Sequence, residues 1–303
     1  MPRWFNQFLV NSMPFMPRFL VGFVASRYVA GDTLTDAAQC IRELNRNRFC
    51  ATADVLGEHI HDLSETELPV RMYLDLIEKI AAEQLDCGVS LKLSQLGLEL
   101  DEATAWHNFE RILMRVREKD LFLRIDMEDS SLTDKTLEIF KRARSLYANI
   151  GIVLQACLFR SLDDLEYLLP LGVNVRICKG IYKEPAEIAH QSKAEINKNF
   201  MEMVSACLNG DGYAAIATHD LDLIRECESF IRERRIPDKH FEFQALLGVP
   251  VQNTLKRLVQ DGHKVRLYVP YGRDWYAYSL RRLRENPDIA GYVFRDFFKM
   301  KQS

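Results

Sequence analysis

Eight short apolar runs, separated by longer amphipathic stretches, constrain the fold of this 303-residue chain more than any other feature. The runs have the length of strands, and the stretches between them repeat apolar residues at the spacing of a helix face. Eight strand-then-helix units predict a (βα)8 barrel with parallel strands. The runs are RFCATADVL (48–56), GVSLKLS (88–94), LFLRIDME (121–128), IGIVLQACL (150–158), GVNVRICKG (172–180), YAAIATHD (213–220), HFEFQALL (240–247) and KVRLYVP (264–270).

The competing architecture is a doubly wound open sheet. That fold usually needs fewer strands, and no G-x-G-x-x-G sequence follows the first run. No linker, low-complexity tract or internal repeat interrupts the alternation. We therefore expect an α/β fold of one domain, with a helical segment at 1–45 packed on a TIM-type barrel at 46–303. Between the fourth and fifth runs, Ser161 and Asp164 predict a capping box that starts a helix.

The N-terminal segment 5–31 is rich in Phe, Leu, Val and Met, but Pro14, Pro17, Arg18 and Arg27 interrupt it. No part of it reaches the roughly 18 consecutive apolar residues of a membrane-spanning helix. An interrupted apolar region also makes a poor signal peptide. We expect one or two amphipathic helices packed on the barrel, and contact with a membrane surface is the alternative.

Composition excludes several functions. The net charge of −3 and the absence of a basic run argue against a nucleic-acid partner. The seven cysteines are scattered without a C-x-x-C spacing, which fits reduced thiols in a cytosolic protein. Of the seven histidines only His219 lies at a strand end, so a zinc site is not expected. A phosphate-binding P-loop is also absent.

Polar side chains lie within or just after every one of the eight runs. Barrel enzymes build their active sites at the C-terminal ends of the strands, and burying an unpaired charge costs several kcal/mol. We therefore expect an active site at this end of the barrel. The polar residues, in strand order, are Asp54 and Glu58, Lys92, Asp126 and Glu128, Gln155, Arg176 with Lys179 and Tyr182, Thr218 with His219 and Asp220, Glu242 and Gln244, and Tyr268.

The helical stretch YAYSLRRLREN (276–286) places Tyr278, Arg281, Arg282 and Glu285 on one face. Such a face is either simply solvated or holds an anion, since twin guanidinium groups bind carboxylates well. Two other readings of the chain remain open from the residues alone. One is an aldolase-type barrel with a Schiff-base lysine, and the other is a non-catalytic barrel scaffold.

The motifs at the strand ends resemble those of the proline dehydrogenases, both the small monofunctional enzymes and the barrel domain of the bifunctional proline utilisation proteins. The resemblance covers about residues 45–295, and ADVLGE (53–58) also looks like the family's first strand and loop. Cys178, Ile181 and Leu247 depart from the residues often found in relatives. The matching motifs, in order, are SLKLS, RIDMED, VLQA, VRICKGIY, ATHD, FEFQALLG, VRLYVPYG and YSLRRLREN.

The resemblance implies a distorted (βα)8 barrel whose eighth helix tilts over the barrel mouth. It implies non-covalently bound FAD and the oxidation of L-proline to Δ1-pyrroline-5-carboxylate, the first step of proline catabolism, by hydride transfer from proline C5 to the flavin N5. Electrons would pass to a quinone-type acceptor, and a separate pyrroline-5-carboxylate dehydrogenase would act next. The implied location is cytoplasmic, with peripheral association at the inner membrane face as the alternative. A Schiff base on Lys92 or Lys179 is the competing chemistry.

The resemblance also assigns roles to individual residues. Arg281, Arg282 and Lys92 would hold the proline carboxylate. The remaining substrate contacts would be Tyr268 and Tyr278 as walls, Glu285 and Asp126 as balancing charges, and Glu58 as a gate paired with Arg281. Arg176 would lie beside the flavin ring near N5, oriented by Asp126, and these two are the catalytic residues expected. Other positions that match the cofactor site are Met127, Gln155, Lys179, Gly180, Ile181, Thr218, His219 and Gln244, with Glu242 as a weaker match.

Overall fold

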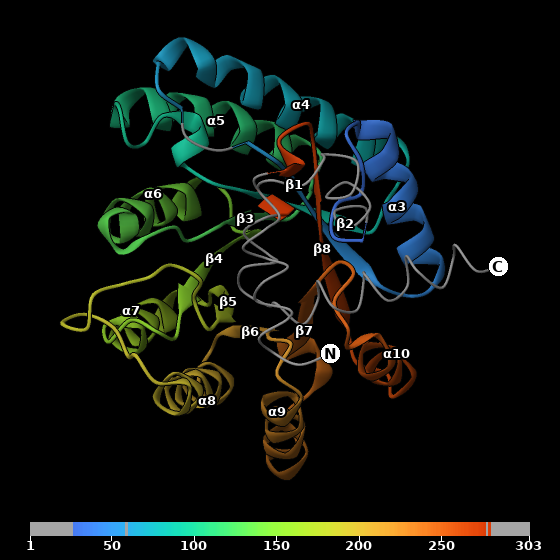
Figure 1. Cartoon of the computed structure of the whole chain (residues 1–303), viewed down its shortest axis with the longest axis vertical. Coiled ribbons are helices and arrows are strands. Elements are labelled where there is room, and N and C mark those ends of the chain that lie inside the picture. Colours follow the sequence, from blue (N-terminus) through green and yellow to red (C-terminus); the bar gives the residue numbers. More distant parts are fainter. Residues whose placement is uncertain (1–26, 58–59, 277, 280–303) are drawn as a thin grey trace, which may run out of the picture.

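The computed structural model describes residues 27–57, 60–276 and 278–279. Eight parallel strands form a closed barrel in sequence order, and the last strand pairs with the first (Figure 1). This confirms the predicted (βα)8 architecture, and each strand falls within its predicted run, except that β2 begins one residue earlier and β8 ends one residue later. The strands are β1 Cys50–Val55, β2 Cys87–Leu91, β3 Leu123–Ile125, β4 Ile150–Gln155, β5 Asn174–Cys178, β6 Tyr213–Ala217, β7 Phe241–Leu246 and β8 Val265–Tyr271.

Helices surround the barrel, and each connection between successive strands contains one (Figure 1). Their apolar faces pack on the outer side of the sheet, where the main hydrophobic core lies. The α-helices are α3 Leu34–Arg46, α4 Glu67–Ala82, α5 Glu102–Glu118, α6 Thr133–Leu146, α7 Ser161–Leu168, α8 Lys193–Asn209, α9 Leu221–Arg234 and α10 Gln252–Gln260.

The predicted capping box at the start of α7 is wrong. The residue that flanks the helix is Arg160, and it makes no side-chain cap. Ser161 already lies within the helix, and its hydroxyl donates to the backbone oxygen of Gln155 at 2.6 Å. The serine therefore ties α7 to the end of β4, because that carbonyl offers a buried acceptor that the sequence does not reveal.

Helix α3 precedes the first strand, yet it belongs to the ring of helices. It packs against both β1 and β8, at the seam where the barrel closes. Its inward side is fully buried at Ile41. The segment before it is tied to the end of β8, because Ala30 N donates to Pro270 O at 2.9 Å and Gly272 N donates to Gly31 O at 3.0 Å.

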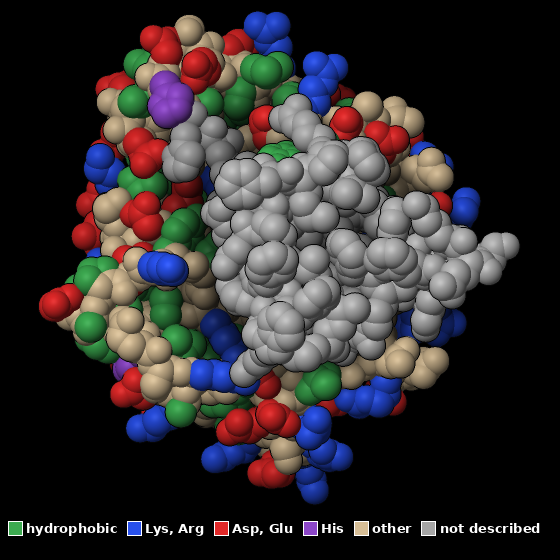
Figure 2. Space-filling view, in the orientation of Figure 1, with side chains coloured by type: hydrophobic (Ala, Val, Ile, Leu, Met, Phe, Trp, Pro, Cys, Tyr) green, Lys and Arg blue, Asp and Glu red, His purple; other side chains and the backbone are tan. Residues whose placement is uncertain are grey.

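Several expectations fall on residues outside the description. Most of the segment 5–31, where amphipathic helices are expected, and most of the helix expected at 276–286 lie there, and the domain division at residue 45 stays a prediction. Among the described residues, no helix is both long and apolar enough to cross a membrane. Acidic and basic side chains lie side by side on the visible face, which shows no large patch of one sign (Figure 2).

Truncating the buried face of α3 tests whether this helix stabilises the barrel. We expect Ile41→Ala to lower the free energy of unfolding by about 2–5 kcal/mol, because the side chain leaves a cavity against the sheet. Urea unfolding followed by circular dichroism measures this. The exposed Gln39→Ala on the same helix is the control, and equal stability of the two variants would contradict the packing role of α3.

Candidate functional site

Asp126, directly after β3, lies at the centre of a hydrogen-bonded cluster inside the mouth of the barrel. Its Oδ1 accepts from Ser90 Oγ and from Arg176 Nη1, both at 2.6 Å, and its Oδ2 accepts from the Tyr268 hydroxyl at 2.8 Å. Burial alone would raise the pKa of Asp126, but Arg176 and Lys92 lower it below its ordinary value. The cluster is therefore organised around an ionised carboxylate.

Arg176 on β5 is held from two sides. Besides its bond to Asp126, its Nε donates to Gln244 Oε1 on β7 at 2.7 Å. The guanidinium also lies over the ring of Tyr268, 5.3 Å from the ring centroid. A planar cation held by an acid, an amide and an aromatic face has little rotational freedom, so its position at the mouth is preorganised.

A second buried ion pair, between Glu242 and Arg266, lies near the N-terminal ends of β7 and β8. Glu242 on β7 accepts from Arg266 Nε on β8 at 2.8 Å, and Gln244 Nε2 donates to Glu242 Oε1. Arg266 also donates to the backbone oxygen of Ala51 at 2.7 Å. Burial alone would raise the pKa of Glu242, but Arg266 lowers it to about 2. The ion pair therefore stays charged although both side chains are buried.

Sequence reasoning missed Arg266 and Arg124 because both lie at the start of their strands rather than at the end. A signal was present, since Arg124 and Asp126, and likewise Arg266 and Tyr268, are two residues apart and so share the inner face of a strand. Arg124 is buried, and its guanidinium donates to the backbone oxygens of Ile152 and Asn174 at 2.9 and 2.8 Å.

Lys92, just beyond β2, reaches the same mouth. Its Nζ lies 3.1 Å from Oδ2 of Asp54, a side chain with no exposed surface. Burial alone would lower the pKa of Lys92, but Asp54, Asp126 and Glu128 together raise it above its ordinary value. The amine therefore stays protonated, which suits anion binding and argues against a Schiff-base nucleophile at this position.

The ends of β5 and β6 are joined by a second lysine–aspartate pair. Lys179 Nζ lies 2.8 Å from Asp220 Oδ2, and the Asp220 backbone N–H donates to Thr218 Oγ1 at 3.1 Å. His219 Nε2 accepts from the backbone N–H of Leu246 at 3.1 Å. That nitrogen therefore carries no proton, and the histidine links the ends of β6 and β7.

Gly180 follows β5 with a φ of +96°, a conformation that favours glycine. A Cβ at this position would lie 2.3 Å from Cys157 Sγ and 3.3 Å from Gln155 Oε1. Among the described residues, crowding by Cys157 thus explains the glycine, which the family resemblance placed at the cofactor site. Gln155 Nε2 donates to the backbone oxygen of Glu128 at 2.8 Å, which ties the end of β4 to the loop after β3.

The remaining predicted residues fall into two groups. Met127 and Tyr278 are buried, whereas Ile181 is exposed. The predicted residues that lie outside the described part of the chain are Glu58, Arg281, Arg282 and Glu285. No group of three or more potential metal ligands occurs among the described residues.

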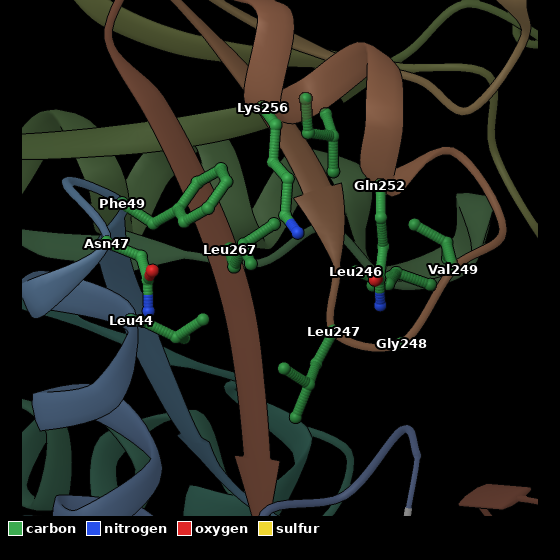
Figure 3. A pocket seen from close by; sticks show the side chains of 11 residues that line it. Leu44, Asn47, Phe49, Leu246, Leu247, Gly248, Val249, Gln252, Lys256 and Leu267 are labelled. Carbon is green, nitrogen blue, oxygen red and sulfur yellow. The ribbon is translucent and has the colours of Figure 1, made fainter. Parts of the chain in front are cut away.

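A separate pocket lies on the flank of the barrel between α3 and α10 (Figure 3). Its volume is about 200 Å³, and most of its lining is apolar, with Lys256 pointing into it. Leu247, one of the positions that departs from the family pattern, lines this pocket. None of the predicted substrate or cofactor residues in the described part of the chain does so.

Comparison with known proteins identifies a consistent set of relatives. The family model described as proline dehydrogenase matches residues 37–295. Proline dehydrogenase 1 of Bacillus subtilis subsp. natto is 38% identical over 275 residues, covering 91% of each chain. Proline dehydrogenase of Deinococcus radiodurans is 36% identical over 281 residues, covering 91% of this chain and 90% of the relative.

Among solved structures, proline utilization A of Bdellovibrio bacteriovorus inactivated by N-propargylglycine superposes with a TM-score of 0.80. It is 24% identical, and the alignment covers 87% of this chain and 32% of that larger one. At this identity the likeness supports the barrel fold.

The Glu242–Arg266 pair predicts how stability changes in acid. Because folding lowers the pKa of Glu242 from 4.5 to about 2, the pair contributes stability above pH 4.5 and loses it as the pH falls toward 2. The contribution is about 3 kcal/mol. The difference in free energy of unfolding between wild type and Glu242→Gln, measured by urea unfolding, should therefore be smaller at about pH 3 than at about pH 6. A difference independent of pH would contradict a charged buried pair.

Proposed function

The chain belongs to the proline dehydrogenase family, and we propose that the cluster around Asp126 and Arg176 is its active site. It is an oxidoreductase that oxidises proline in proline catabolism. The observation that carries the site assignment is the convergence of Lys92, Asp126, Arg176 and Tyr268 at one end of the barrel. These residues come from four different strands or strand ends, and buried charge of this kind is expected where chemistry occurs.

Lys92 is the described cation that we propose for the carboxylate of L-proline. Its ammonium remains protonated and its acidic partner, Asp54, is fully buried behind it. Arg281 and Arg282 would complete the carboxylate site, with Glu285 as a balancing charge. Tyr268 and Tyr278 would form the walls around the ring. Three cations around one carboxylate would fix the ring of the substrate for reaction at C5.

The family consists of flavoenzymes, and we propose FAD, bound without a covalent link, as the cofactor of this chain. The donor chemistry fits, because among the described residues Arg176 uses two of its five N–H donors, on Asp126 and Gln244. The remaining donors suit a ring edge that gains negative charge on reduction. The residues proposed to hold it are Met127, Gln155, Arg176, Lys179, Gly180, Ile181, Thr218, His219 and Gln244.

FAD, when bound, supplies the two-electron oxidant that accepts hydride from proline C5. The protein's part is to hold the carboxylate at Lys92 and to keep Arg176 oriented through Asp126. The product is Δ1-pyrroline-5-carboxylate. Because a protonated amine lacks the lone pair that drives C–H cleavage, activity should rise with pH through the ionisation of the bound substrate.

We further propose that the electrons reach a quinone-type acceptor and that a separate pyrroline-5-carboxylate dehydrogenase consumes the product. The location proposed is the cytoplasm, with peripheral association at the inner membrane face as the alternative. Glu58 would act as a gate over the site by pairing with Arg281. These proposals rest on the family resemblance of the sequence motifs.

A visible spectrum before and after anaerobic L-proline tests the proposed function directly. We expect flavin absorption that bleaches with proline and not with glycine, which lacks the ring and its C5 carbon. A flavin band that does not respond to proline would contradict the substrate. A colourless protein that FAD cannot reconstitute would contradict the cofactor.

Lys92→Met tests the carboxylate role. We expect KM for proline to rise by about 10- to 100-fold with FAD still bound, since one charge-assisted hydrogen bond is lost. Steady-state kinetics and the flavin spectrum measure the two effects separately. Lys198→Met, an exposed lysine on α8, is the matched control. Loss of FAD with an unchanged KM would overturn the assignment.

A further inference from the structure

Two buried carboxyl groups, Asp54 and Asp126, face the same mouth but have different surroundings. Asp126 accepts three hydrogen bonds from side chains, one of them from the guanidinium of Arg176. Asp54 lies 3.0 Å from the Tyr73 hydroxyl and 3.1 Å from Lys92 Nζ, and the Tyr268 hydroxyl also interacts with it, but no guanidinium of the described residues bonds to it. When environments differ in this way, one acid of a pair ionises readily and the other retains a proton.

The hydroxyl of Tyr73 on α4 is shared between two acceptors. It lies 3.0 Å from Asp54 Oδ1 and also 3.0 Å from Oε1 of Gln95, in the short helix η3 (Ser94–Leu96). The orientation of the Gln95 amide is fixed, because its Nε2 donates to the backbone oxygen of Val55 at 3.0 Å and to that of Gly57. All three side chains are buried, so each polar atom needs a partner within the protein.

Counting the protons available for hydrogen bonding distinguishes two protonation states of the Asp54, Tyr73 and Gln95 side chains. If Asp54 is ionised, the single hydroxyl proton of Tyr73 has two acceptors, and either Asp54 Oδ1 or Gln95 Oε1 loses its donor. If Asp54 carries a proton on Oδ1, Asp54 donates to Tyr73 and Tyr73 donates to Gln95. Every donor then has an acceptor, from Asp54 to the backbone oxygens of Val55 and Gly57 at and just after the end of β1.

We propose that Asp54 is a neutral carboxylic acid that holds its proton on Oδ1, and that the Asp54–Tyr73–Gln95 chain thereby leaves the charge of Lys92 available for the substrate carboxylate. This inference rests on the proposed function, and it makes Asp54, Tyr73 and Gln95 positioning residues. A neutral Asp54 still accepts a hydrogen bond from Lys92 through Oδ2, so it holds the ammonium in place without neutralising it. The carboxylates of Asp126 and Glu128, which also raise the pKa of Lys92, then favour its protonated form.

The charged and titratable groups around Asp54 support this state. Within the described chain these are Lys92 after β2, Asp126 after β3, Tyr73 on α4, and Tyr268 and Tyr271 on β8. Burial raises the pKa of Asp54, Lys92 and the Tyr268 hydroxyl lower it, the negative charge of Asp126 raises it, and the net direction is above the ordinary value. As the pH rises, Asp54 ionises and competes for Lys92, so carboxylate binding should weaken.

Infrared spectroscopy of the holoenzyme tests the protonation state. The wild-type-minus-Asp54→Asn difference spectrum at neutral pH should contain the C=O band of a neutral carboxylic acid, and this band should shift in D2O. A difference spectrum with only carboxylate bands would overturn the proposal. This readout needs no substrate, so it is independent of whether proline is the substrate.

Binding of cyclopentanecarboxylate, an unreactive analogue without the amine, tests the consequence through the flavin spectrum. Asn reproduces the hydrogen bonds of a neutral acid, so Asp54→Asn should bind the anion within about twofold of wild type and lose the weakening at high pH. Tyr73→Phe should bind the analogue about tenfold more weakly. Without the Tyr73 hydroxyl, Asp54 loses the acceptor for its proton, so it ionises more readily and competes with the analogue for Lys92. Tyr147→Phe, which removes a tyrosine hydroxyl bonded to Leu121 O, is the matched control.

These outcomes distinguish failure of the proposal on Asp54 from failure of the proposed function. Much tighter anion binding by Asp54→Asn would show that Asp54 is ionised and neutralises Lys92, which overturns the proposal. Wild-type affinity in Tyr73→Phe would likewise overturn it. If the wild-type flavin does not bleach with proline, the proposed function fails on its own, whatever the infrared result.

Discussion

The ion pair between Asp126 and Arg176 is the interaction on which the mouth of the barrel depends. Isolated charges inside a barrel would be very unfavourable, whereas here each charge has a partner with good geometry. The pairing continues from Arg176 through Gln244 to Glu242 and Arg266, so that strands β3, β5, β7 and β8 are joined through their inner faces. The barrel interior is thus a hydrogen-bonded network, and the hydrophobic core lies outside it, between strands and helices.

Much of this architecture was predictable because it repeats. Eight apolar runs gave eight strands, and alternation at two-residue spacing within a strand, as in Arg124 and Asp126, determines which side chains point inward. Contacts made across the tertiary structure were not predictable. The Ser161 hydroxyl bonds to a strand end rather than capping its helix. Helix α3 completes the ring of helices, and a pocket separates it from α10, which is far away in the sequence.

The candidate site shows the same division. Sequence motifs at the strand ends predicted Lys92, Asp126, Arg176 and Tyr268 as site residues, and the structure places them at one end of the barrel. Tyr73 could not be found in this way, because it comes from a helix and reads as an ordinary core aromatic. Its role depends on which buried acceptors its hydroxyl meets, and this is a property of the packing of α4 and η3 against β1.

The two lysines that follow strands illustrate how local partners separate binding from structure. Lys179 pairs with Asp220, which also caps α9 and binds Lys193, so its carboxylate is already committed to several structural contacts. Lys92 pairs with Asp54, which is bonded to no other cation among the described residues. The carboxylate partner of Lys179 is thus shared with a second cation and a helix start, whereas that of Lys92 is not. Two lysines that follow strands therefore differ in how far their acidic partners are engaged elsewhere, and this difference is the basis for proposing Lys92 as the cation of the carboxylate site.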